Sequence, residues 1–303
     1  MILGSAFAPP FRNSLPKGSS GHASDRRSAR AERFEYYLAL LSEELDHADR
    51  VKPLRDYVTG LLLAGKRKSI EPIAGRIDPG HFCARHQSLH HFIAIATSKD
   101  RALLRVICQQ ALPALLHLGE IENWVVDDTG FPKCGKHSVG VERQSCGRLG
   151  KTDNCQVAVS LMISHRLASL PIAFDLYLTK RWAYDWVRRK KAGMLREIKF
   201  RTKHEIALAQ IDAALLAGLS RGIINADVGF GNYTDFRDAL TTRRLHDAVG
   251  IQATTTVWPR RGKDRLCRVV HCGKRVSDCR TRAFFPRGKS WPIERHALSN
   301  IQR

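Results

Sequence analysis

Residues 124–130 read Trp-Val-Val-Asp-Asp-Thr-Gly, a short apolar run that ends in two acids. Tryptophan and β-branched valines favour an extended strand. An ionised carboxylate at the end of a buried strand is costly unless it meets a cation or hydrogen-bond donors. Because neighbouring strand residues point to opposite faces, only one of the two acids can face a site there. We favour Asp128, with Asp127 as a structural partner.

A second strand of the same kind lies further along the chain. Ile223-Ile-Asn-Ala-Asp227 again ends an apolar run with an acid. Two such acids on neighbouring strands can bridge two Mg²⁺ or Mn²⁺ ions, which would activate a water or a DNA 3′-hydroxyl for phosphoryl transfer. Asp128 and Asp227 are therefore candidate catalytic residues and metal ligands. The alternative is that both are ordinary acids at a strand end or a helix cap.

The order of elements around these acids predicts a mixed sheet with helices on its faces. Alternation and helical spacing predict strands at 124–128, 157–163, 170–178, 222–226 and 248–254, and helices at 203–216 and 235–244. The first three strands follow one another without a helix, which predicts an antiparallel meander. Leu208, Ile211 and Leu215 should form the buried face of the first helix. This is the order of an RNase H-like core without its last helix, over residues 120–258.

The chain before this core has a helical pattern over residues 31–119. Two helices are indicated by apolar residues at helical spacing: Phe34, Leu38, Leu41 and Leu45, then Leu54, Val58 and Leu61 after Pro53. Further helices are predicted at 86–96 and 100–116. Residues 1–30 are rich in Ser, Gly, Pro and Arg and predict a disordered leader. The predicted fold class is α+β, with a helical N-terminal domain that contacts DNA.

The charge of the chain favours a polyanionic partner. Its net charge is +21, and residues 259–303 carry thirteen basic and three acidic residues. Lysine and arginine on phosphates release condensed counterions, so DNA is the expected partner. No apolar run approaches the roughly 20 residues of a membrane span, and Met1 to Pro10 lacks the basic flank of a signal peptide. We expect a cytoplasmic protein without a membrane partner.

Three other motifs permit alternative readings. Residues 130–137, Gly-Phe-Pro-Lys-Cys-Gly-Lys-His, miss a phosphate-binding P-loop by one residue, because His137 stands where that loop needs a hydroxyl. A helix should also follow a P-loop, and the glycines after this segment argue against one. His86 and His90 could bind a metal from one helix face, although such histidines more often pack or contact phosphate. Cys267, His271, Cys272 and Cys279 match no common zinc spacing, and the eight cysteines predict mainly reduced packing residues.

Basic residues after the first strand are better interpreted as contacts with a DNA backbone. The candidates in this loop are Lys133, Lys136, Arg143, Arg148 and Lys151. Lys68 and His86 are further candidates in the helical region.

Several sequence blocks in order resemble the DDE transposases of the insertion-sequence 701 family, near the larger insertion-sequence 4 group. They include Val126-Asp-Asp-Thr-Gly-Phe-Pro-Lys133, Gly135-Lys-His-Ser-Val-Gly-Val141, Asp153-Asn-Cys-Gln-Val-Ala-Val-Ser160 and Ala226-Asp-Val-Gly-Phe-Gly231. Further matches lie at Arg67–Pro72, His86–Phe92, Ser169–Pro171 and 202–208. The resemblance runs from about residue 34 to Trp258.

This resemblance implies a Mg²⁺-dependent transposase that cuts transposon ends and joins them to target DNA. The family's first acid falls on Asp128 and its second on Asp227. A third acid, a glutamate on a late helix, has only a weak counterpart in Glu294, because the insertion before it is missing and Pro292 disturbs a helix. The sequence after Trp258 loses its pattern, which suggests an out-of-frame tail; downstream DNA without family-like sequence in another frame would refute this.

Three functional hypotheses follow from this resemblance. The first is a DDE transposase whose chain, without the third acid, has little or no activity. The second is a non-catalytic DNA-binding remnant that occupies transposon ends or interferes with intact transposase. The third is an unstable product that exposes apolar surface. DNA is the expected partner in the first two, and a homo-oligomer is a further expectation.

Overall fold

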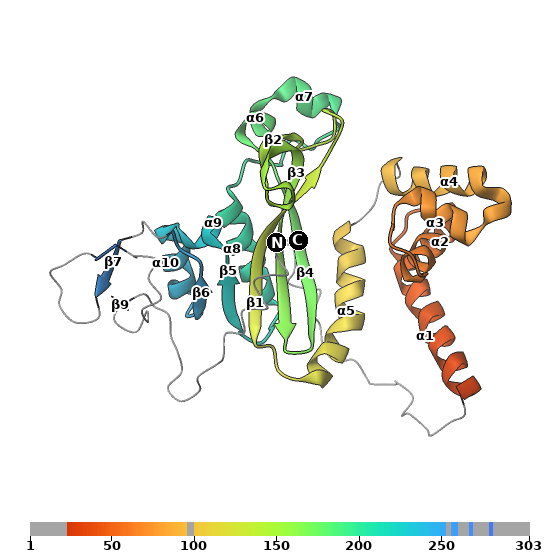
Figure 1. Cartoon of the computed structure of the whole chain (residues 1–303), viewed down its shortest axis with the longest axis horizontal. Coiled ribbons are helices and arrows are strands. Elements are labelled where there is room, and N and C mark those ends of the chain that lie inside the picture. The colour runs from red at the N-terminus through yellow and green to blue at the C-terminus, as the bar shows by residue number, and fades with distance from the viewer. Residues whose placement is uncertain (1–22, 96–99, 253–255, 260–266, 269–278, 281–303) are drawn as a thin grey trace. The chain divides into compact units, whose positions relative to one another are not determined.

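The computed structural model describes residues 23–95, 100–252, 256–259, 267–268 and 279–280. Its contacts divide the chain into two compact units. Unit 1 contains five helices in the described residues: α1 (Ala23–Glu43), α2 (Val51–Leu62), α3 (Ile70–Ile77), α4 (Phe82–His90) and α5 (Asp100–Leu118). The helices are labelled in Figure 1. None of the described helices is long and apolar enough to cross a membrane.

Two apolar clusters hold the helices of unit 1. Leu41, Leu54 and Val106 join α1, α2 and α5 in one cluster. The second cluster is built by Ile73 and Leu89 of α3 and α4. Gly60 of α2 lies directly against Ile73, so the missing side chain lets α2 and α3 approach closely.

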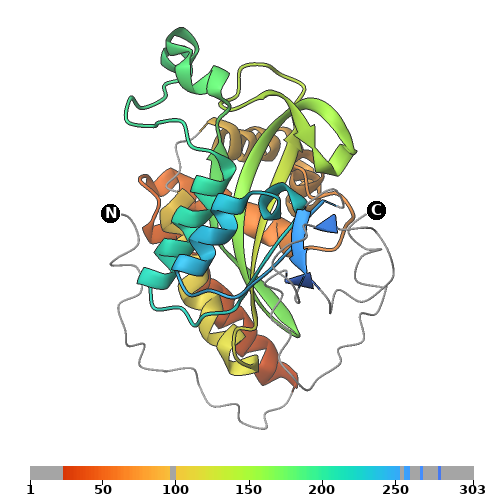
Figure 2. The ribbon, with the colours of Figure 1, turned by 90° about the vertical axis from the view of Figure 1, so that its left-hand side faces the viewer.

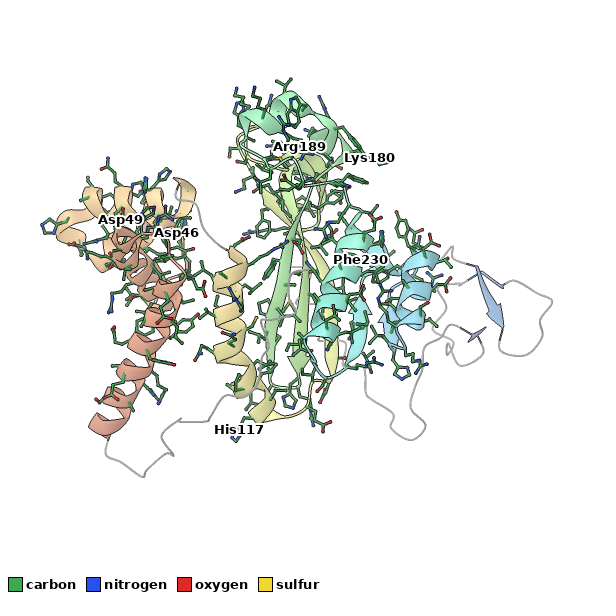
Figure 3. All side chains as sticks on the ribbon, turned by 180° about the vertical axis from the view of Figure 1, so that it is seen from behind. Asp46, Asp49, His117, Lys180, Arg189 and Phe230 are labelled. Atoms are coloured by element: carbon green, nitrogen blue, oxygen red, sulfur yellow. The ribbon has the colours of Figure 1, made fainter. Side chains whose placement is uncertain are left out.

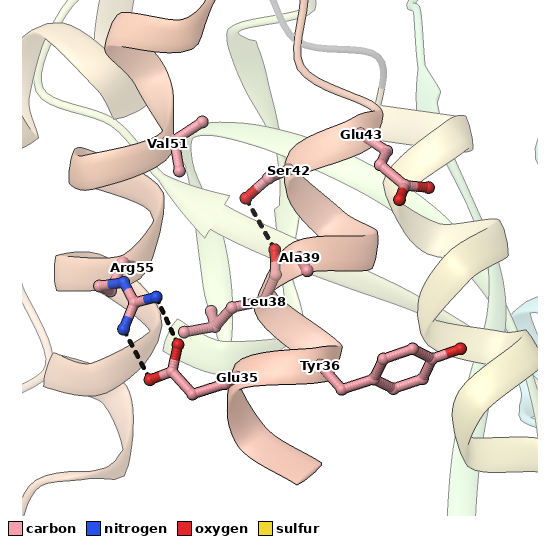
Figure 4. Close-up of a pocket in the computed structure, with 8 residues that line it drawn as sticks. All are labelled: Glu35, Tyr36, Leu38, Ala39, Ser42, Glu43, Val51 and Arg55. Carbon is pink, nitrogen blue, oxygen red and sulfur yellow. Dashed lines mark hydrogen bonds and ion pairs between the residues drawn. The ribbon is translucent and has the colours of Figure 1, made fainter. Parts of the chain in front are cut away.

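An open hollow of about 730 Å³ lies along α1 and α2 (Figure 4). The Glu35 carboxylate accepts hydrogen bonds from both terminal nitrogens of Arg55 within it. Because these charges neutralise one another, the hollow is better described as a packing feature of the two helices than as a site.

The helical predictions for this unit are largely confirmed, with two corrections. Leu38 and Leu41 are buried as predicted, whereas Leu61 is 39% exposed. The predicted disordered leader is wrong at its C-terminal end, because α1 begins at Ala23. Helix propensity over Ala23 to Ala31 outweighs the polar composition on which that prediction rested. Residues 1–22 lie outside the described residues.

The sheet has six strands in the described residues. They are β1 (Asn123–Pro132), β2 (Glu142–Cys146), β3 (Lys151–His165), β4 (Ala168–Tyr177), β5 (Ile223–Ala226) and β6 (Asp247–Val249). The strand order is β2-β3-β1-β5-β6, and β4 also pairs with β3. The strands β1, β5 and β6 are parallel neighbours, whereas β2 and β3 are antiparallel. This mixed sheet confirms the predicted α+β class and the RNase H-like core.

Three further helices follow, namely α8 (Lys203–Leu216), α9 (Val228–Gly231) and α10 (Thr234–Thr242). Helix α9 contacts β5, β6 and α10, and Gln210 of α8 donates to a carbonyl of β3. Figure 2 shows α8 and α10 side by side. Their contact includes His204, whose ring centroid lies 5.8 Å from that of Phe236. The buried face of α8 contains Ile211 as predicted, together with Ile206 and Gln210 rather than Leu208 and Leu215.

The sequence did not predict three elements of the second unit. These are β2, α6 (Lys180–Tyr184) and α7 (Trp186–Lys191). The predicted strand at 248–254 corresponds to the three-residue strand β6. Beyond it, β7 (Thr256–Pro259), β8 (Cys267–Arg268) and β9 (Cys279–Arg280) form a small separate sheet. Much of the predicted tail, including Glu294, His271 and Cys272, lies outside the described residues.

Candidate active site

Two acids directly follow the last paired residues of the parallel strands β1 and β5. The pairing of these strands ends with Val126 opposite Ala226, and the next residues are Asp127, within β1, and Asp227, directly after β5. Residues that pair across parallel strands present their side chains to the same face. Both acids are exposed. The charge of Asp227 acts on the Asp127 carboxyl, so these two acids lie close together, while Asp128 points to the opposite face of β1.

The pKa of the Asp127 carboxyl is raised above its ordinary value. Desolvation by the surrounding protein is the largest cause, and the negative charges of Asp128 and Asp227 add to it. A hydrogen bond from the Asp128 backbone N–H to Asp127 Oδ1, at 2.8 Å, opposes the rise. Like charges that face one another disfavour ionisation, and a cation between them would relieve this repulsion.

Asp128 already has a cationic partner. Its Oδ2 contacts Nζ of Lys203, the first residue of α8, and both side chains are about one-third exposed. The same ammonium lies 5.5 Å from the centroid of the Tyr177 ring. This ion pair links the middle of β1 to α8 on the face of the strand opposite to Asp127.

A glycine-rich turn fixes the position of Asp227. Asp227 directly precedes α9, whose Phe230 is 1% exposed and packs against Phe236. Figure 3 labels Phe230 beside the sheet. A side chain on Gly231 would collide with the Gly250 carbonyl oxygen, so only glycine allows α9 to close against the end of β6. The sequence Asp-Val-Gly-Phe-Gly thus holds the acid at the end of β5.

The chemistry of these donors fits a hard divalent cation. Carboxylate oxygens are the ligands that Mg²⁺ and Mn²⁺ prefer, and Asp127 and Asp227 could supply them from neighbouring segments of the chain. Within the described part of the chain, no group of three or more His, Cys, Asp or Glu side chains could hold a metal. The predicted third acid, Glu294, is outside this part, as are two of the four residues of the zinc alternative.

The predicted basic loop is a hairpin in the structure. Lys133 follows β1, and its backbone N–H donates to the Asn154 carbonyl at 2.9 Å. Arg143 pairs with Asn154 across β2 and β3, and Lys151 begins β3. The five predicted DNA contacts here, namely Lys133, Lys136, Arg143, Arg148 and Lys151, are all exposed. The P-loop alternative is wrong, because a turn and strand β2 follow Gly135 where that motif needs a helix.

The two predicted DNA contacts of unit 1 have local partners. Lys68 Nζ donates to the Leu63 carbonyl. The ring of His86 stacks on Phe82 at 5.9 Å and on His90 at 6.3 Å. His86 and His90 thus contact one another through their rings, and no metal cluster includes them among the described residues.

Sequence reasoning missed Lys203 as a partner of the acidic strand end, and His204, whose Nε2 lies 3.1 Å from the Gly229 carbonyl oxygen of the turn. The sequence places both residues at the start of a predicted helix, next to Thr202. Only the folded structure shows that they lie near Asp128 and the turn after β5. The basic run Arg188-Arg-Lys-Lys191 was visible in the sequence and was not assigned a role.

Two comparisons with known proteins bear on the family of the chain. Residues 40–268 match the family described as DDE superfamily endonuclease. A "probable transposase for insertion sequence element IS701" from Microchaete diplosiphon is 31% identical over 189 residues, which cover 62% of this chain and 45% of that protein. This match agrees with the resemblance found in the sequence. The chain spans less than half the length of this relative. Because the family match covers well over half of the residues, the chain belongs to the DDE superfamily endonucleases.

Proposed function

We propose that the chain is a transposase that cleaves and joins DNA strands by metal-assisted phosphoryl transfer. The observation that carries this proposal is the proximity of Asp127 and Asp227, which directly follow the last paired residues of the parallel strands β1 and β5. Bound Mg²⁺ or Mn²⁺ would supply the activation of the attacking oxygen and charge stabilisation of the leaving oxygen. Family membership and the net charge of +21 support DNA as the substrate.

Each group of this chain has a distinct part in the proposed reaction. Asp127 and Asp227 would hold the metal in this proposal; the sequence favoured Asp128 with Asp227, but Asp128 is paired with Lys203. The Lys203–Asp128 ion pair holds this part of β1 against α8, on the face of the strand opposite to Asp127. The β2–β3 hairpin binds phosphates through its exposed basic side chains and so places the scissile strand.

A plasmid-nicking assay tests cleavage without knowledge of the transposon ends. We expect supercoiled DNA to be nicked with Mn²⁺ or Mg²⁺ and not with EDTA. Asp127→Asn and Asp227→Asn should each lower the rate by roughly 100-fold or more, because a metal ligand contributes several kcal/mol to the transition state. Nicking that is equal in wild type and both variants would contradict the proposal.

A non-catalytic DNA-binding role is the second candidate. It is supported by the convergence of only two carboxylates within the described residues. Its signature would be salt-sensitive DNA binding without metal-dependent nicking, and binding by Asp127→Asn at wild-type affinity or better.

A further inference from the structure

The segment between β4 and α8 has the densest charge of the described core. Residues 180–201, here called the basic platform, contain nine basic and two acidic residues. Its net charge of +7 is one third of the +21 of the whole chain. Exposed apolar residues are interleaved with these charges: Tyr184 is 74% exposed, Trp186 48% and Leu195 67%.

A buried arginine gives the basic platform a fixed shape. Arg189 is 7% exposed, and its guanidinium donates to the carbonyls of Ala183 at 2.7 Å, Leu195 at 2.8 Å and Ile198 at 2.7 Å. These bonds wrap the loop after α7 around the helix. Figure 3 labels Arg189 at the end of the sheet near β2 and β3. The exposed cations on α7 and on this loop are therefore held on one small body.

The basic platform is bonded to the hairpin that already carries the predicted phosphate contacts. Arg188 donates to the carbonyls of Lys136 at 2.9 Å and Val141 at 3.0 Å. Trp182 Nε1 donates to the same Val141 carbonyl at 2.8 Å. At its other end, the platform leads within two residues to Lys203, the partner of Asp128. Platform, hairpin and acid pair thus belong to one connected part of unit 2.

Helix stabilisation does not account for this charge. Cations in the last turn of a helix interact favourably with its dipole, which could explain Lys190 and Lys191 on α7. The exposed Arg196 and Lys199 follow that helix and lie beyond its last turn. Among the described residues, neither Lys190, Lys191 nor Lys199 forms an ion pair with an acid. Local acids therefore leave the platform strongly positive.

We infer that the basic platform binds the phosphate backbone of duplex DNA beside the acid pair, and that Lys190, Lys191 and Lys199 make the contacts. Exposed cations on a rigid support fit phosphates, and the interleaved Tyr184 and Trp186 can pack against sugars or frayed bases. This inference rests on the proposed function, because it assigns a new surface to the same DNA substrate.

Charge reversal on the platform, with a matched control, tests this inference. Lys190→Glu/Lys191→Glu is compared with Arg166→Glu/Arg221→Glu, which changes the net charge equally. Arg166 and Arg221 are exposed, and Arg221 precedes β5 at the end opposite to Asp227. Binding of a fluorescent duplex of arbitrary sequence is measured in EDTA by anisotropy at several salt concentrations. Circular dichroism melting confirms that each variant is folded.

We expect Lys190→Glu/Lys191→Glu to weaken binding roughly tenfold or more near 0.1 M salt. Loss of two phosphate contacts should also reduce the slope of log affinity against log salt by about 2. The control variant should keep the wild-type slope. Equal loss in both variants, or none in the platform variant, would overturn the inference and direct the search to an acidic protein partner. Absence of DNA binding by the wild type would instead refute the proposed function.

Lysine acetylation with and without the duplex provides an independent readout. Mass spectrometry should find Lys190, Lys191 and Lys199 protected by DNA in the wild-type chain. Unchanged modification of all three in the presence of saturating duplex would also overturn the inference.

Discussion

At the scale of single residues, the site depends on which way two adjacent acids point. Asp127 faces Asp227 and has a raised pKa, whereas Asp128 is neutralised by Lys203. One acid is thus held in an environment that disfavours its charge, and its neighbour is satisfied by a cation. This difference gives the two residues opposite expected responses to substitution.

Asp127→Asn should stabilise the metal-free protein at neutral pH. A carboxyl whose pKa is raised on folding contributes stability below its unfolded pKa of about 3.9, and this is lost as pH rises through the folded pKa. The asparagine removes the ionised group and therefore raises the melting temperature at pH 7. The gain should shrink toward pH 4. Melting curves in EDTA at both pH values test this, and a lower melting temperature of the variant at pH 7 would contradict it.

We expect exposed cysteines to react faster with a thiol reagent than buried ones. Burial raises the pKa of the Cys108 thiol to about 11, while Cys83 and Cys134 are exposed. Since the thiolate is the nucleophile, iodoacetamide near pH 8 should label Cys83 and Cys134 quickly in the native protein and leave Cys108 unmodified. Peptide mass spectrometry measures each rate. Labelling of Cys108 at the rate of Cys83 before unfolding would contradict its buried position.

At the scale of elements, strong local patterns were enough to predict α8 and β5, and the helices α1, α2 and α5. The orientation of these elements was harder to predict, because it depends on distant partners. Gln210 is buried since its amide donates to Val159 O and to Asp175 Oδ2, both at 3.0 Å. The buried residue of α7 is Arg189, which donates hydrogen bonds to carbonyl groups. The sequence of this helix therefore shows no apolar residues at helical spacing. Which face of the sheet the Asp127 side chain occupies depends on the register between β1 and β5, and the sequence does not specify that register.

The contact between α2 and α3 predicts opposite effects for two glycines. In Gly60→Ala, the new methyl collides with Ile73, which is fully buried. Overpacking costs about 1–3 kcal/mol and exceeds a helix-propensity gain of at most about 1 kcal/mol, so we expect a net loss of about 1–2 kcal/mol.

Gly75→Ala in α3 provides the matched control. Its new methyl lies 3.8 Å from the Phe82 ring, an ordinary contact, so we expect a gain of about 0.5–1 kcal/mol. Urea unfolding measures both free energies. Equal stabilisation by the two substitutions would show that Ile73 can move aside.

At the scale of the whole molecule, chemistry and charge are concentrated in unit 2. Asp127 and Asp227, the β2–β3 hairpin and the basic platform all belong to it. The sequence predicted the fold class, and it named Asp227 and the exposed basic residues of the hairpin as candidates whose roles stay predictions. It did not predict the platform, whose shape depends on hydrogen bonds of Arg189 that no local pattern indicates.

The central claim is that Asp127 and Asp227 form the metal pair, and Mn²⁺ binding tests it most directly. Free Mn²⁺ is measured by electron paramagnetic resonance in titrations of wild type, Asp127→Asn, Asp227→Asn and Asp128→Asn. We predict that the first two substitutions abolish the site and that Asp128→Asn retains it. Loss of Mn²⁺ binding in Asp128→Asn together with retention in Asp127→Asn would contradict the account and make Asp128 the ligand.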